Sequence, residues 1–190
     1  MRELSLHILD IIRNSISAGA SNVKLMVMGD KSTDRLSIEV ADNGKGMDNN
    51  LLQRIYDPFV TSRSTRRVGM GIPLLKDTAL RCSGDLIVES KKGLGTIVKT
   101  DFMISHIDRP PLGSLGETMA DLITGEPQTR FEVELASEKI FFRLDTREIK
   151  NRLGKAPINS YEVWEWIKEC IDENTKLVFK DILNEVSGQN

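Results

Sequence analysis

Apolar and polar positions alternate with a period of two in four segments of the first 105 residues, which predicts four strands. These segments are residues 23–27, 36–40, 85–89 and 96–102. Polar residues 29–34 connect the first two strands and predict a hairpin connector. The turn Lys91-Lys92-Gly93 connects the other two. The second strand ends at Asp42, where glycines interrupt the alternation.

Segments with helical spacing lie between these strands. One row, in which Ser15 is the polar member, predicts a first helix that ends near Gly19: Leu4, Ile8, Ile11, Ile12 and Ser15. Asp48 is a good N-cap for a short helix that runs through Leu51 and Ile55 and ends before Pro58. Gly71 opens a further helix with a proline in its first turn. Residues 60–68 lack apolar periodicity and predict a loop. The pattern therefore predicts an α+β fold in which helices and antiparallel strands form two layers.

A change of composition over residues 105–116 separates this part from the rest of the chain. That junction contains two prolines and two glycines, and it predicts a boundary between a domain of residues 1–105 and a C-terminal extension of residues 106–190. The pattern of the extension predicts a short helix over residues 115–123 and a hairpin over residues 131–144. It then predicts a second short helix over residues 146–153 and a long amphipathic helix over residues 160–171, capped by Ser160. We expect Trp164 and Trp166 of the last helix to be packing residues.

The composition excludes several classes of protein. The chain has 190 residues, with 26 basic and 28 acidic side chains and a net charge of −2, so nothing indicates binding to nucleic acid or to an anionic membrane. Cys82 and Cys170 have no zinc-site spacing and fit a reducing compartment. The amino terminus lacks the apolar core of a signal peptide, and no apolar run approaches the ~20 residues of a membrane helix. We therefore expect a cytoplasmic protein.

Two short segments place polar groups at the ends of predicted elements. In Asp10-Ile11-Ile12-Arg13-Asn14 the acid and the amide are four residues apart and project from the same side of the first helix. The Asn14 oxygen suits a hard cation such as Mg²⁺, although it could instead bond to the neighbouring backbone. Asp42 is an acceptor suited to the exocyclic amine of adenine, and it is also a turn former. Gly44 and Gly46 remove side chains where a flat base would enter.

Two glycine-containing segments complete the set, Gly69-Met70-Gly71-Ile72 and Gly93-Leu94-Gly95-Thr96. Gly69 and Gly71 precede a helix, so its free N–H groups and positive end would face phosphates. Three arginines of the preceding loop could clamp terminal phosphate oxygens, or they could form a solvated basic loop: Arg63, Arg66 and Arg67. Together the four segments predict a pocket for ATP and Mg²⁺.

The ordered set resembles the GHKL superfamily, the ATP-binding fold of sensor histidine kinases, gyrase-type topoisomerases, the heat-shock chaperone ATPase and the mismatch-repair ATPase. The segments correspond to its N box, its Asp-x-Gly-x-Gly box and its two later glycine boxes, and Tyr56-Asp57-Pro58-Phe59 resembles the phenylalanine box of the kinases. The resemblance covers residues 4–103 and implies a Bergerat fold, with helices on one face of a mixed, mainly antiparallel sheet. It also implies that Asn14 holds magnesium, that Thr96 binds near the adenine, and that Met70, within the glycine box, contributes to the nucleotide site. Met47 and Ile72 would add apolar contact to the base, or they could be ordinary core residues.

Two features depart from this family. Asp10 stands where the family has glutamate, which is one methylene longer and reaches about 1.5 Å further. Because of this change, the sequence supports ATP binding more strongly than ATP turnover. The only histidines are His7 and His106, and neither carries a phospho-acceptor motif. His7 could be an acceptor, or a partly buried helix residue. We therefore do not expect self-phosphorylation of the usual histidine kinase kind.

These observations lead to one functional hypothesis and its alternatives. We expect a cytosolic signalling protein that binds Mg-ATP and hydrolyses it or transfers its γ-phosphate to a partner protein, as the serine/threonine kinases that act as anti-sigma factors do. The catalytic side chains would be Asp10, Arg63, Arg66 and Arg67. A non-catalytic, ATP-gated switch is the alternative, and a fragment of a DNA-repair protein or topoisomerase ranks last. A homodimer is compatible with the sequence.

Overall fold

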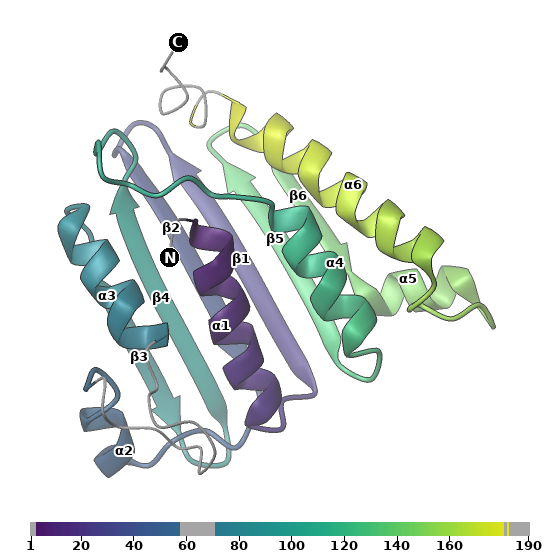
Figure 1. Ribbon diagram of the computed structural model, residues 1–190, viewed down its shortest axis with the longest axis horizontal. Coiled ribbons are helices and arrows are strands. Elements are labelled where there is room, and N and C mark those ends of the chain that lie inside the picture. Colours follow the sequence, from purple (N-terminus) through teal and green to yellow (C-terminus); the bar gives the residue numbers. More distant parts are fainter. Residues whose placement is uncertain (1–2, 58–70, 181, 183–190) are drawn as a thin grey trace.

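The computed structural model describes residues 3–57, 71–180 and 182 (Figure 1). Helices and strands follow one another in this order: α1 (Leu4–Ser17), β1 (Asn22–Asp30), β2 (Arg35–Asp42), α2 (Asn49–Gln53), α3 (Gly71–Arg81), β3 (Leu86–Lys91), β4 (Gly95–Met103), α4 (Leu115–Gly125), β5 (Arg130–Ser137), β6 (Phe141–Asp145), α5 (Thr146–Leu153) and α6 (Tyr161–Val178). Every predicted strand and helix within these residues is present.

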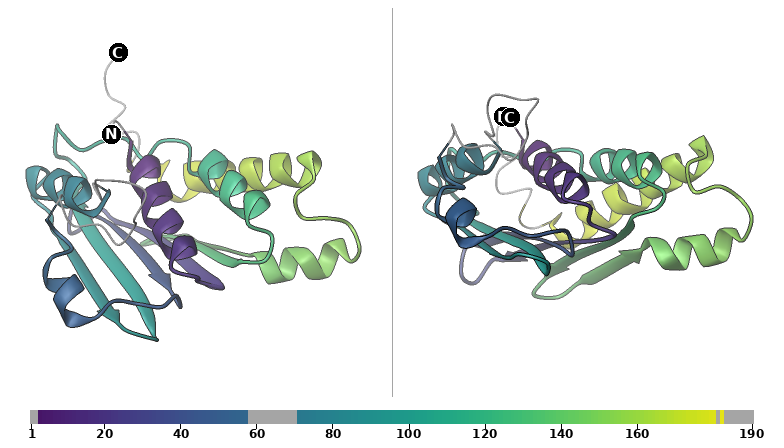
Figure 2. Two further views of the ribbon diagram at one scale, coloured as in Figure 1. Left: turned by 60° about the horizontal axis from the view of Figure 1, so that its bottom comes forward. Right: turned by 90° about the horizontal axis from the view of Figure 1, so that it is seen from below.

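The strands form one six-stranded sheet in the order β3-β4-β2-β1-β5-β6. Neighbouring strands are antiparallel, except that β1 and β5 are parallel. Helices α1, α3, α4 and α6 lie over the same face of the sheet, as the two views of Figure 2 show. The predicted two-layer α+β architecture, with helices on one face of a mixed and mainly antiparallel sheet, is confirmed.

Alternation along the strands explains why one face attracts the helices. In β1, for example, Val23, Leu25 and Val27 are buried, while the residues between them are partly exposed. The same alternation in β2 buries Leu36 and Val40 on the same side. Because successive side chains point to opposite faces of a sheet, each strand contributes a row of apolar residues to one core under the helices.

Several predicted boundaries are confirmed and two are wrong. The Asp48 carboxylate accepts a hydrogen bond from the Leu51 N–H at 2.9 Å and caps α2 as predicted, but α2 ends at Gln53 rather than near Ile55. The predicted connector over residues 29–34 is too long. β1 continues to Asp30, because that residue still pairs with the first residue of β2. The loop predicted over residues 60–68 lies outside the described residues.

Strand pairing joins the two parts of the chain. β5 pairs with β1 along the register from Asn22 to Gly29, and buried residues of both parts belong to one hydrophobic cluster. Gly116 in α4 donates its N–H to the Asp172 carboxylate at 2.8 Å, and a Cβ at this position would collide with the Lys168 carbonyl of α6. The glycine therefore allows α4 and α6 to pack closely. The division of the chain into a domain of residues 1–105 and an extension of residues 106–190 stays a prediction.

The junction between the two parts is itself packed against α1. Glu3 makes no side-chain capping bond to α1. Instead, the Leu4 and Ser5 N–H groups donate to the carbonyls of Pro111 and Leu112 at 2.9 and 2.8 Å. These bonds satisfy two of the donors that every helix N-terminus leaves without an intrahelical partner. The chain that follows β4 therefore caps the first helix.

Among the described helices, none is both long and apolar enough to cross a bilayer. Cys82 is buried and Cys170 is partly buried, and both are free thiols.

His7 lies inside the core on α1. Its side chain is buried at 2 % exposure, and neither ring nitrogen has a hydrogen-bond partner among the described residues. Burial lowers the pKa of His7 from 6.5 to about 4, because a charged imidazolium would lose its hydration there. The alternative in which His7 accepts a phosphoryl group is not favoured, since its nitrogens are not accessible to solvent.

The buried histidine predicts acid sensitivity. Below pH 6.5 the unfolded chain protonates His7, whereas the folded chain does not until about pH 4. Stability should therefore fall as the pH drops through this window. Between pH 7 and pH 5 we expect His7 to account for about 2 kcal/mol of the loss in unfolding free energy, measured by urea titration. His7→Leu should lack this part of the loss, whereas His106→Gln should keep it. An identical pH dependence in His7→Leu and the parent would contradict the assignment.

Candidate functional site

The Asp42 carboxylate is held in place at the end of β2. Its Oδ2 accepts a hydrogen bond from the Ser15 hydroxyl at 2.6 Å, and its Oδ1 accepts one from the Gly44 N–H at 2.8 Å. Asp42 faces Thr96 across the β2–β4 pair. Because each carboxylate oxygen has a second lone pair, Asp42 can accept one further bond from a ligand N–H in a fixed direction. The role of Asp42 toward adenine stays a prediction.

Ser15 was not predicted as a site residue. It lies on α1 next to Asn14, is 3 % exposed, and also approaches the Ile11 carbonyl at 3.4 Å. The signal in the sequence was a serine within an otherwise apolar helical row. A buried hydroxyl in such a row needs a partner, and here the partner is Asp42.

The Ser90 hydroxyl of β3 lies within hydrogen-bond distance of three groups near Asp42. Its hydroxyl donates to the Gly95 carbonyl at 2.9 Å and accepts from the Met47 N–H at 2.9 Å. The Thr96 hydroxyl lies 2.9 Å from the same oxygen. No motif signalled Ser90, because only the pairing of β3 with β4 brings it to this edge.

The glycines of this region serve backbone packing. Gly46 has φ +61°, and a Cβ on it would collide with the Lys91 carbonyl. Gly95 has φ +117°, and a Cβ there would collide with the Asp42 carbonyl. A Cβ on Gly44 would lie 3.0 Å from both the Ala18 Cβ and the Asp42 carboxylate. These contacts require glycine whether or not a base enters, so the predicted role of Gly44 and Gly46 toward a ligand stays a prediction.

Asp10 and Asn14 meet the start of α3. A Cβ placed on Gly71 would lie 3.5 Å from the Asp10 Cβ and 4.0 Å from the Asn14 amide nitrogen. The structure therefore brings together the first helix and the N-terminus of α3, whose first N–H groups and positive dipole end favour anions. Asp10 is partly buried and Asn14 is exposed. The Asp10 carboxylate has no hydrogen bond or ion pair within the residues that the structure covers.

The remaining predicted residues fall into two groups. Met47 and Ile72 are partly buried and pack against the hydrophobic core, so only part of each side chain stays accessible. The other group lies outside the described residues, so nothing here tests it: Arg63, Arg66, Arg67, Gly69 and Met70.

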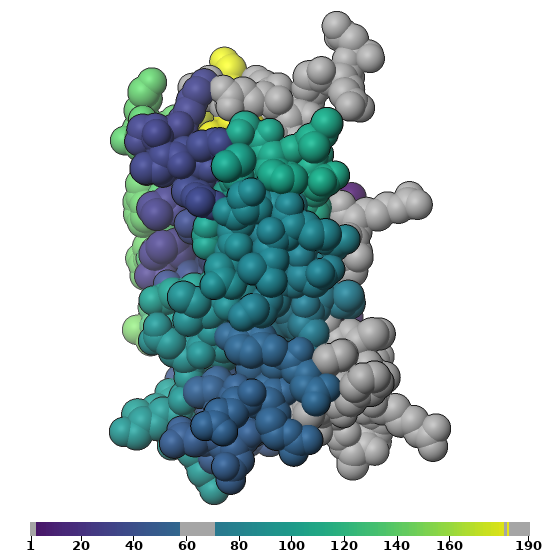
Figure 3. Space-filling view, turned by 90° about the vertical axis from the view of Figure 1, so that its left-hand side faces the viewer, coloured from purple at the N-terminus to yellow at the C-terminus, as the bar shows by residue number. Residues whose placement is uncertain are grey.

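Tyr56, from the segment that resembles the phenylalanine box, links α2 to its neighbours. The Lys76 ammonium of α3 lies 4.0 Å from the Tyr56 ring centroid, and the Tyr56 hydroxyl is 3.5 Å from the Leu86 carbonyl of β3. Figure 3 shows α2 below α3 on this side of the molecule. The segment that follows α2 is thus attached to both α3 and the edge of the sheet.

The oxygen atoms of the described site residues suit Mg²⁺ only together with phosphate oxygens of a bound nucleotide. Within the described residues no cluster of three histidine, cysteine, aspartate or glutamate side chains is placed to hold a metal. Mg²⁺ in nucleotide sites commonly takes one or two protein oxygens, with phosphate and water oxygens completing the octahedron. The Asn14 amide oxygen fits that pattern as the protein ligand, with Asp10 nearby on the same helix.

Comparison with known proteins reveals one family and one shared fold. Residues 2–106 match the family described as histidine kinase-, DNA gyrase B- and HSP90-like ATPase. Sporulation kinase D of Bacillus subtilis is 30 % identical over 98 residues, which cover 52 % of this chain and 19 % of that kinase. Sensor histidine kinase YvrG of the same organism is 27 % identical over 93 residues, which cover 47 % of this chain and 16 % of that protein. The chain thus spans under a fifth of these two relatives.

A solved structure, the N-terminal domain of a DNA repair protein, has a similar fold. It superimposes with a TM-score of 0.57 at 14 % identity, covering 83 % of this chain and 59 % of the other. At this identity the likeness concerns the fold alone. It extends beyond residues 2–106, and so includes part of the C-terminal segment.

The hydrogen bond from Ser15 should set the affinity for adenine. Removing the hydroxyl leaves the Asp42 oxygen without its donor and frees the carboxylate to rotate, so Ser15→Ala should weaken binding of a non-hydrolysable ATP analogue about 5- to 30-fold in calorimetry. Asp42→Ala should weaken it at least 100-fold. Ser17→Ala is the matched control, because the Ser17 hydroxyl donates to the Arg13 carbonyl of its own helix. Equal affinities for Ser15→Ala and Ser17→Ala would refute the positioning role.

The two glycines of the β3–β4 turn should differ in their tolerance of a side chain. Gly93 has φ +82° and open space around it, so Gly93→Ala should cost about 1 kcal/mol of unfolding free energy. Gly95→Ala adds a collision with the Asp42 carbonyl and should cost more than about 3 kcal/mol. Urea unfolding measures both. Similar losses for the two variants would show that the turn moves to accept the collision.

Proposed function

Because this chain belongs to the family of histidine kinase-, DNA gyrase B- and HSP90-like ATPases, we propose that it binds Mg-ATP in signalling. In this proposal it either hydrolyses the nucleotide or transfers the γ-phosphate to a partner protein. The matched segments are small parts of the relatives, so the relatives' complete activities are not carried over with the fold.

One observation carries the proposal, namely that α1 serves both ends of the site. Ser15 of α1 binds the Asp42 carboxylate at the end of the sheet. Asp10 and Asn14 of the same helix face the start of α3 at Gly71. Residues 10 and 15 are separated by about 7.5 Å along the helix axis. A single rigid element thus holds the acceptor for a base and the groups that would meet phosphates.

Each described residue has a role in this proposal. The Asn14 amide oxygen would hold magnesium together with phosphate oxygens, and the bound ion would neutralise phosphate charge. Asp10 would orient or deprotonate the attacking water or hydroxyl, since its carboxylate has no competing partner in the described part of the chain. The N–H groups at the start of α3 would bind phosphate oxygens. Arg63, Arg66 and Arg67 are proposed to neutralise charge that develops during transfer.

A second candidate function is an ATP-gated switch without turnover. Two observations favour it. Asp10 is shorter than the family's glutamate, which places its carboxylate further from a bound phosphate. In addition, β1 pairs with β2 of the nucleotide site on one side and with β5 of the C-terminal segment on the other. A change at the site would then reach the C-terminal segment through a shared strand. We propose a cytoplasmic protein partner for either function.

Replacing the Asp10 carboxylate should separate these two functions. With γ-labelled ATP and cell extract, we expect the parent to release phosphate or to label a protein. Asp10→Asn should reduce that rate at least 100-fold, because an amide cannot accept the proton, while the ATP dissociation constant changes less than about 3-fold.

Asp77→Asn provides the control for this experiment. Its carboxylate is exposed and pairs with Arg81 on the surface of α3, so both binding and turnover should match the parent. Nucleotide binding without turnover by the parent, in the presence of extract, would favour the switch. Absence of nucleotide binding would overturn both functions.

A further inference from the structure

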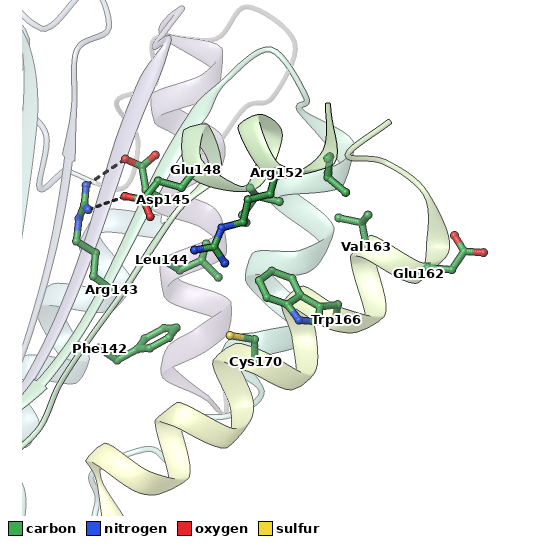
Figure 4. Close-up of a pocket in the computed structure, with 12 residues that line it drawn as sticks. Phe142, Arg143, Leu144, Asp145, Glu148, Arg152, Glu162, Val163, Trp166 and Cys170 are labelled. Atoms are coloured by element: carbon green, nitrogen blue, oxygen red, sulfur yellow. Dashed lines mark hydrogen bonds and ion pairs between the residues drawn. The ribbon is translucent and has the colours of Figure 1, made fainter. Parts of the chain in front are cut away.

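A second pocket lies at the opposite edge of the sheet from the predicted nucleotide site. It is an open pocket with a volume of about 420 Å³, lined by residues of β6, α5 and α6 (Figure 4). β6 is an edge strand and stands three strands away from β2, which corresponds to about 14 Å at the usual strand spacing. None of the residues that line it belongs to the four motif segments. The pocket is therefore a separate feature.

The lining of this pocket is largely apolar. Its apolar and sulfur-containing side chains come from all three elements: Phe142, Leu144, Ile149, Leu153, Val163, Trp166 and Cys170. Val163, Trp166 and Cys170 form a row along α6 that is distinct from the buried row of Ile167 and Ile171. Trp166 is 50 % exposed. A second apolar row on the same helix, open to solvent, is a feature typical of ligand sites.

Most charges at the rim of the pocket are already compensated. Arg143 lies 3.0 Å from the Asp145 carboxylate and 3.1 Å from the Glu148 carboxylate. Asp145 also binds Arg130, and this hydrogen-bonded guanidinium lowers the pKa of Asp145 to about 2. The Glu162 side chain points away from the pocket in Figure 4. Arg143, Asp145 and Glu148 are thus engaged with one another, and Glu162 faces away from the pocket.

Arg152 of α5 differs from these groups. Its guanidinium lies between Leu144 and Trp166, over the apolar lining (Figure 4). Within the described residues it makes no hydrogen bond or ion pair. The pocket consequently combines apolar walls with one exposed guanidinium that makes no ion pair among the described residues.

We propose that this pocket binds a small monocarboxylate with an aromatic or branched apolar body. A guanidinium offers two parallel N–H donors that match a carboxylate. One positive charge balances one negative charge, whereas a dianionic phosphate would need further donors that the apolar walls lack. The volume falls within the usual range for small-molecule sites. Trp166 supplies a flat face against which the apolar body stacks.

Naphthalene-2-carboxylate and its neutral analogue naphthalene-2-carboxamide are suitable probes for this site. By calorimetry on the full chain we expect the carboxylate to bind with a sub-millimolar dissociation constant and the amide at least 10-fold more weakly. Arg152→Gln should weaken carboxylate binding at least 10-fold and leave amide binding unchanged. Trp166→Ala should weaken both. Arg147→Gln is the control on the same helix, because this exposed residue does not line the pocket.

Several outcomes would overturn the proposal. They are absence of carboxylate binding up to 5 mM (roughly 3 kcal/mol of binding free energy), equal affinity for the two probes, an unchanged affinity in Arg152→Gln, or displacement of the probe by ATP. The last would place the probe in the nucleotide site. We expect Arg152→Gln to unfold at the same temperature as the parent, because the Arg152 side chain makes no polar contact with the described residues. An equal unfolding temperature would establish that the variant is folded.

Discussion

The placement of α1 over the sheet is the constraint on which both halves of the predicted nucleotide site depend. The helix has no side-chain cap at its start and relies on the carbonyls of Pro111 and Leu112. Its apolar row packs into the core, and Ser15 near its end binds Asp42. Fixing the helix at both ends also fixes the residues between them. The direction of Asp10 is therefore set by contacts on either side of it.

The C-terminal segment contributes to this placement. Pro111 and Leu112 precede α4, and α4 packs against α6 through Gly116. β5 then completes the sheet beside β1. The family match ends at residue 106, yet these contacts tie the later residues to the first helix. Buried residues of the two segments belong to one hydrophobic cluster.

The exposed face of the sheet is charged where β1, β5 and β6 meet. Lys24 pairs with Glu134 at 2.9 Å, and Arg143 contacts carboxylates from both β5 and β6. Cross-strand ion pairs of this kind add only a little stability each when partly exposed. They keep this face polar, and they also occupy the acids around the second pocket. Arg152, which also lines this pocket, makes no ion pair among the described residues.

The sequence by itself determined the local features of this protein. The periods of apolar residues and the caps at Asp48 and Ser160 depend on neighbours within a few residues, and they were predicted correctly. Tertiary structure decided the rest. The parallel pairing of β5 with β1, the Ser15–Asp42 bond and the position of Ser90 join residues that lie far apart along the chain. Local spacing cannot specify such contacts, because they form only when the whole sheet and its helices pack around one core.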